Sequence, residues 1–170
     1  MSLENLVEIN RKTQVTGSTL FNTVKCVYLN FCPSATTEGA VGTFQAYTYA
    51  TININHPVKE IIVKQIAWVD NQSSAPGQYD IGVLFGDIVN GGCLGTFNAN
   101  NASISIPHYT GYQNVRHVYR TPKNISGSYQ FTIQDLLGLP FKDTATRTIA
   151  QAAVIMEFIS YDGTVTDVST

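Results

Sequence analysis

The sequence predicts an all-β fold, because nearly every strongly patterned segment alternates apolar and polar residues with a period of two. Turn signals rich in Asn, Gly, Ser and Pro separate these segments at the spacing of a sandwich or barrel. At 170 residues with an apolar fraction of 44%, the chain fits one domain with a packed core. We therefore expect a single β-sandwich over residues 14–170, preceded at residues 1–13 by an arm or a short helix.

Eight segments carry the two-residue period. In chain order they are residues 24–32, 44–54, 58–70, 79–89, 102–106, 115–120, 128–134 and 148–161. Eight antiparallel strands in a chain of this length match a jelly roll, in which two Greek keys fold over each other. An immunoglobulin-type sandwich is the alternative, but it usually takes about 100 residues. The predicted fold is therefore an antiparallel eight-stranded jelly-roll sandwich.

The first four expected strands differ in the faces that they bury. In the first, the residues that share one face are Val27, Leu29 and Phe31. The second presents Tyr47 and Tyr49 on the side opposite its more apolar face. In the third, the apolar residues move from one alternate set of positions to the other near Lys64, which predicts a β-bulge or a strand covered on both sides. In the fourth, the apolar residues Ile81, Val83 and Phe85 occupy alternate positions and therefore share one face. Gly82 and Gly86, on its other parity, leave room for a close approach.

The last four expected strands are less uniform. The fifth and sixth are short, whereas the seventh alternates cleanly, with Tyr129, Phe131 and Ile133 on its inward face. The eighth is the longest, and its run Ala-Ala-Val-Ile-Met-Glu also fits a helical turn. We expect a strand there, because Val, Ile, Phe and Tyr dominate its second half and no capping residue opens it.

The charge is low for a soluble domain. Ten Lys and Arg against twelve Asp and Glu make 13% of the chain, about half the usual 25%. The net charge of −2 excludes a chain that is driven as a whole onto nucleic acid or an anionic membrane. Either neutral polar side chains cover the surface, or other subunits do. We expect a homo-oligomer, and the residues expected at its interface are Tyr47, Tyr49 and Trp68.

The motifs of catalysis and metal binding are missing from the sequence. There is no HExxH, CxxC, P-loop, GxGxxG or GxSxG pattern. The histidines His56, His108 and His117 are scattered, without a metal-ligand spacing. We therefore expect no catalytic residue, no metal and no cofactor, and a protein that is not an enzyme.

One cluster of residues is basic and aromatic. Arg116, His117, Arg120 and Lys123 fall within eight residues, near Tyr112 and Tyr119. Such a mixture can grip single-stranded nucleic acid, or another anionic ligand such as a glycan, through charge and ring stacking. The alternative is an edge strand that is guarded by charge. The residues of this candidate patch are Tyr112, Arg116, Tyr119, Arg120 and Lys123, with Tyr109 as a further exposed ring.

The ends and the cysteines bear on location. Residues 1–13 contain no apolar core segment of the kind found in a signal peptide, and no run of 18 apolar residues occurs. We expect a chain that stays in the cytoplasm of the producing cell or enters a virion, without a membrane partner. Cys26 and Cys32 are too far apart along one extended segment to form a disulfide.

Two late segments resemble those of single jelly-roll virion proteins from virophages and related large DNA viruses. The segments are residues 125–135 (ISGSYQFTIQD) and 152–160 (AAVIMEFIS). The resemblance implies a structural, virion-associated protein of the minor-capsid kind. It also implies a trimer like those of the tumour-necrosis-factor and complement globular-domain sandwiches, with self and other virion proteins as partners.

Overall fold

The computed structural model describes residues 20–33, 43–70, 81–90, 92–98, 108–109, 114–140 and 149–161. The regular secondary structure of these residues is all β. The strands are β1 (Leu20–Asn30), β2 (Tyr47–Asn53), β3 (Val58–Asp70), β4 (Ile81–Gly86), β5 (Cys93–Asn98), β6 (His108–Tyr109), β7 (Val115–Lys123), β8 (Ser126–Gln134) and β9 (Ile149–Tyr161). The expected arm at residues 1–13 and the expected strand at residues 102–106 lie outside the described residues.

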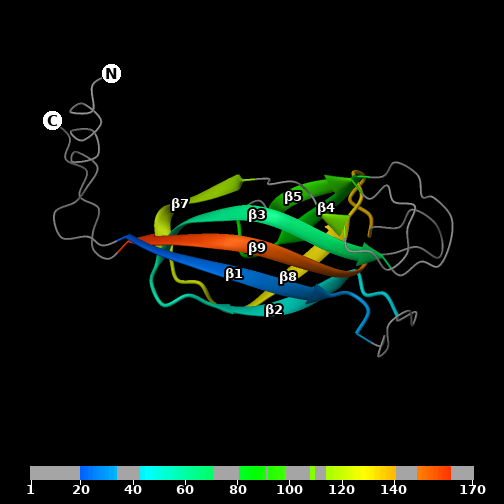
Figure 1. Cartoon of the computed structure of the whole chain (residues 1–170), viewed down its shortest axis with the longest axis horizontal. Helices are drawn as coiled ribbons and strands as arrows, with labels where there is room; N and C mark the ends of the chain where they lie inside the picture. Colours follow the sequence, from blue (N-terminus) through cyan, green and yellow to red (C-terminus); the bar gives the residue numbers. More distant parts are fainter. Residues whose placement is uncertain are drawn as a thin grey trace, which may run out of the picture.

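The strands form two antiparallel sheets that face each other as a sandwich (Figure 1). The first sheet has the order β1-β9-β3, and both β6 and β7 pair with the free side of β3. The second has the order β2-β8-β4-β5. Since β6 pairs with residues 67–68 of β3 and β7 with residues 58–63, these two strands share one position. Each sheet therefore has four strand positions, and the predicted antiparallel β-sandwich is confirmed.

The predicted inward faces make up the core between the sheets. The residues of these faces that are buried are Val27, Leu29, Phe31, Phe131 and Ile133, and Met156 and Phe158 of β9 join them in the core. Burying one such side chain stabilises the fold by about 1.5–3 kcal/mol. The parity change in β3 coincides with a register shift against β9 between Val63 and Gln65, as the pattern predicted.

The face of β4 that meets the core is the face of its glycines. Leu84 is fully buried between Gly82 and Gly86, whereas Ile81, from the more regular apolar row, is 42% exposed. The ring of Phe97, the partner of Gly82 on β5, fills the space beside that glycine, so that an added Cβ would lie 2.2 Å from the ring. The glycines leave the predicted room, and core side chains occupy it.

Strand β5 was not predicted. Its pairing with β4 contains a register shift between Leu84 and Phe85, and this irregularity puts Leu94 and Phe97 in the core at a spacing of three residues. Because its buried residues are three positions apart, β5 does not show the two-residue alternation that predicts a strand. Among the described residues, no helix is long and apolar enough to span a membrane.

Candidate functional site

Tyr47 and Tyr49 lie exposed on β2, an edge strand of the second sheet. Their side chains are 47% and 59% exposed, and their rings meet edge to face with centroids 5.8 Å apart. The alternate residues Thr48 and Ala50 are less exposed, so the strand turns its largest rings outward. Because the two rings support each other, a partner that packs on them has less side-chain freedom to remove.

The sheet that carries this tyrosine pair has no charged residue in any of its strands. Neither β2, β8, β4 nor β5 contains Lys, Arg, Asp or Glu. The charged residues of the described strands all belong to the first sheet: Lys25, Lys59, Glu60, Lys64, Asp70, Arg116, Arg120, Lys123 and Glu157. Edge strands that face water are commonly guarded by charged side chains, and β2 and β5 have none. We call the outward surface of these four strands the uncharged face; the Asp87 carboxylate, just beyond β4, accepts a hydrogen bond from the main chain of β8 at its border.

Trp68 does not lie at an exposed interface, contrary to our expectation. It is 5% exposed, and its ring packs on Phe97 with centroids 4.6 Å apart. The register shift in β3 aligns Trp68 with Ile66 on the inward side. Trp68 is therefore part of the core that joins the sheets.

Tyr119 is also buried, so its predicted role as an exposed stacking surface is wrong. The side chain is 4% exposed, and its hydroxyl donates a hydrogen bond to the main-chain carbonyl of Ile88. Desolvation, with a further contribution from Tyr129, raises the pKa of Tyr119 to about 12. Lys123 Nζ lies 5.6 Å from the centre of the Tyr119 ring. Tyr119 ties β7 to the opposite sheet, and Lys123 packs over it.

The remaining basic residues of the predicted patch make separate contacts along β7. Arg116 Nε lies 2.5 Å from Glu60 Oε1, which compensates its charge. Arg120 is exposed, and Lys59 Nζ donates to its main-chain oxygen at 3.0 Å. Tyr112 lies outside the described residues. This arrangement favours the alternative that β7 is an edge strand guarded by charge.

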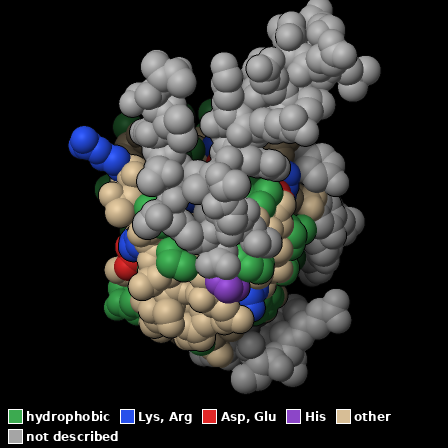
Figure 2. Space-filling model, turned by 90° about the vertical axis from the view of Figure 1, so that its left-hand side faces the viewer, with side chains coloured by type: hydrophobic (Ala, Val, Ile, Leu, Met, Phe, Trp, Pro, Cys, Tyr) green, Lys and Arg blue, Asp and Glu red, His purple; other side chains and the backbone are tan. Residues whose placement is uncertain are grey.

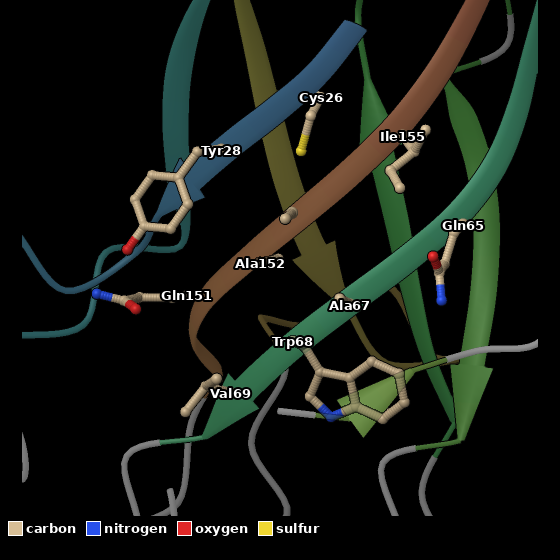
Figure 3. Close-up of a pocket in the computed structure, with 10 residues that line it drawn as sticks. Cys26, Tyr28, Gln65, Ala67, Trp68, Val69, Gln151, Ala152 and Ile155 are labelled. Carbon is tan, nitrogen blue, oxygen red and sulfur yellow. The ribbon is translucent and has the colours of Figure 1, made fainter. Parts of the chain in front are cut away.

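A shallow apolar groove of about 300 Å³ lies on the outward face of the first sheet (Figure 3). Ala67 of β3 and Ala153 of β9 are paired in register and leave it hollow, while Tyr28 of β1 lies on one side of it. Partial burial raises the pKa of the Tyr28 hydroxyl. No pattern in the sequence indicates this groove, because the two alanines are far apart in the chain and meet only through the strand register.

Chemistry-bearing side chains are separate from one another in the described part of the chain. No group of three or more His, Cys, Asp or Glu residues there could hold a metal ion. Cys26, Cys32 and Cys93 are free thiols. The chain matches no protein-family model and no curated protein sequence. What the protein does therefore has to be inferred from its own surfaces.

Proposed function

We propose that the sandwich is a jelly roll and that the protein is a non-enzymatic structural protein, a homotrimeric component of a virus particle. The strand orders β1-β9-β3-β7 and β2-β8-β4-β5 support the jelly roll, because each sheet combines early and late strands of the chain. Two Greek keys folded over each other interleave early and late strands in this way. The virion assignment is supported by the resemblance of residues 125–135 and 152–160 to single jelly-roll virion proteins.

The observation that carries the proposal of self-assembly is the uncharged face with its exposed pair, Tyr47 and Tyr49. A solitary domain would leave this sheet and its edges to water, where they invite uncontrolled pairing with other chains. Another copy of the chain that packs there would remove this hazard. Closed symmetry would then bury the same patch on every subunit.

Light scattering of the full chain at micromolar concentration tests the proposal. We expect three times the chain mass of 18.6 kDa. The double variant Tyr47→Glu/Tyr49→Glu places two charges on the uncharged face, and we expect it to run as a folded monomer. The matched control is Tyr28→Glu, at an exposed tyrosine on the outward side of the other sheet, and we expect it to keep the wild-type mass.

Two results would contradict the proposal. A wild-type mass near 18.6 kDa would remove the oligomer. A Tyr28→Glu variant that dissociates while the double variant stays assembled would move the interface to the other sheet. The virion assignment has its own test, which is copurification of the protein with particles.

The alternative function, a binding module for nucleic acid or carbohydrate on the basic cluster, has less support. Tyr119 is buried and Arg116 is paired with Glu60, so the cluster lacks a stacking platform in the described residues. A salt-titrated DNA-binding assay and a glycan array test this alternative. Binding that is lost in an Arg120→Gln variant would restore it.

A further inference from the structure

A second cavity, of about 400 Å³, opens between the two sheets at one end of the sandwich. It lies where β1, an edge strand of the first sheet, runs beside β2 and the turn that leads from β2 to β3. The lining residues that matter chemically are Phe21, Thr23, Lys25, Asn53, Asn55 and His56. Among the coloured side chains seen at this end of the molecule, neutral groups predominate, and a histidine lies next to a basic side chain (Figure 2).

Lys25 occupies an unusual position for a lysine. Along β1 it stands on the same side as Val27 and Leu29, which are buried in the core, and as Thr23, which lines the cavity. Lys25 is itself exposed, because the cavity opens to water and keeps the ammonium group solvated. The described residues include no ion-pair partner for Lys25.

The opposite wall of the cavity is a turn that is held in place. The Ser126 hydroxyl donates to Asn53 Oδ1 at 2.9 Å, and the Ser160 hydroxyl donates to the main-chain oxygen of His56 at 3.2 Å. This bond holds the Asn53 side chain against β8, on the side of β2 that carries Tyr47 and Tyr49. Asn55, between these two anchored residues, supplies an amide to the cavity. The wall is therefore organised before any ligand arrives.

Phe21 and His56 give the cavity a flat element. Their rings stack in parallel, with centroids 4.0 Å apart and planes 7° from each other. None of the described residues that line the cavity carries a carboxylate. Glu157, which accepts a hydrogen bond from the cavity residue Asn22, is neutralised by Lys64 at 3.1 Å. The positive charge of Lys25 is therefore left for a ligand.

This set of groups has a definite chemical complement. A cation favours a carboxylate, amides and a hydroxyl suit sugar hydroxyls, and aromatic surface suits the apolar face of a sugar ring. The volume lies within the range of small-molecule sites, about 300–1,000 Å³. We propose that this cavity binds an acidic monosaccharide, a sugar ring that carries a carboxylate, with Lys25 on the carboxylate and Asn55 on a ring hydroxyl. This inference is independent of the proposed assembly.

Ligand titrations of the full chain by NMR test the proposal. The probes are glucuronate and N-acetylneuraminate. Three ligands serve as comparisons: glucose has the sugar ring without the carboxylate, acetate has the carboxylate without the ring, and inorganic phosphate is a simple anion. We expect at least one sugar acid to bind about tenfold or more tightly than glucose, acetate or phosphate. Equal binding of acetate or phosphate, or no binding of either sugar acid, would overturn the proposal.

Substitutions locate the site. We expect Lys25→Gln to weaken binding of the sugar acid about tenfold or more, and Lys25→Arg to keep it within a few-fold. The control is Arg120→Gln, which removes one positive charge from an exposed side chain on β7 outside the cavity, and we expect it to bind like the wild type. An equal loss in Arg120→Gln would overturn the proposal.

A lysine that faces inward on an edge strand can also act by preventing the strand from pairing with other chains. This role makes a different prediction, namely that Lys25→Gln changes the mass measured by light scattering and leaves sugar binding intact. We expect the opposite, an unchanged mass with weaker binding. If Lys25→Gln does not fold, Asn55→Ala serves in its place, and undiminished binding in that variant would overturn the assignment of hydroxyl recognition.

Discussion

At the scale of single residues, small and neutral groups in the core permit the close approach of aromatic rings. Gly82 lies directly across from Phe97, and the Phe97 ring lies in turn against Trp68. The contact therefore joins β4, β5 and β3 through three side-chain positions. Space beside a glycine on a core-facing strand is here filled by a neighbouring ring.

Gly82→Ala tests this contact. Its Cβ would lie within 2.2–2.8 Å of three Phe97 ring atoms, and overpacking of this kind costs about 1–3 kcal/mol. Urea denaturation should show this loss in the free energy of unfolding. In a Phe97→Leu background we expect a smaller cost, and the same cost in both backgrounds would contradict the role given to the ring.

His117 makes the free energy of unfolding depend on pH. Desolvation lowers the pKa of its imidazole from the usual 6.5, and Nε2 is buried with no hydrogen-bond partner among the described residues. The unfolded chain takes up this proton near the usual pKa, whereas the folded chain does so only at lower pH. As the pH falls through this interval, the unfolded state binds more protons and the free energy of unfolding decreases.

His117→Gln removes this titration. Between about pH 7.5 and about pH 5, we expect the wild type to lose more stability than the variant. Urea denaturation of both proteins at a series of pH values provides the measurement. Parallel stability curves would mean that the imidazole is protonated as readily in the folded chain as in the unfolded one.

At the scale of elements, two kinds of contact hold β7 in the sandwich: main-chain pairing along one edge and a side-chain hydrogen bond across the core. It pairs with β3, and the Tyr119 hydroxyl reaches across the core to the carbonyl of Ile88, just beyond β4. The outward residues of β7, by contrast, are charged or exposed, as an edge strand requires. The basic and aromatic residues of this segment thus lie on opposite faces of one strand, with Arg116 and Arg120 outward and Tyr119 in the core.

Tyr119→Phe should lower the free energy of unfolding by about 1–3 kcal/mol, because the buried carbonyl of Ile88 loses its donor. Tyr28→Phe is the control, since it removes a hydroxyl from an exposed tyrosine, and we expect a change within about 0.5 kcal/mol. Thermal or urea denaturation measures both. Equal effects of the two substitutions would show that the Tyr119 hydroxyl contributes little.

Alternation predicted most elements because β1, β2, β3, β8 and β9 have one face or more in the core. The bulge in β3 could also be predicted from the sequence, since Lys64 interrupts an otherwise apolar run. Strand β5 was not readable, because its register shift spaces Leu94 and Phe97 like residues on a helix. The strand at residues 115–120 was predicted, but the direction of the Tyr119 side chain depends on the sheet that faces β7.

At the scale of the whole molecule, charge is divided unequally between the two sheets. The strands of one sheet carry every charged residue found in the described strands, and those of the other carry none. Low total charge alone would allow an evenly neutral surface. The division concentrates the neutral surface into one sheet with its two edges.

If folded subunits assemble through this face, unfolding is coupled to dissociation. The Tm of the wild type should then rise when the protein concentration is raised about a hundredfold, whereas the Tm of Tyr47→Glu/Tyr49→Glu should not. Differential scanning calorimetry measures both. A wild-type Tm that is independent of concentration would contradict assembly through folded subunits.

The sequence by itself determined the fold class, most strand positions and the low charge, because alternation and composition are properties of neighbouring residues and of simple counts. Tertiary structure decided which strands share a sheet. That pairing separates the charged strands from the uncharged ones, turns Trp68 and Tyr119 into the core, and brings Lys25 opposite Asn53 and His56. These juxtapositions depend on strand order and register, which join residues far apart in the chain and leave no local pattern.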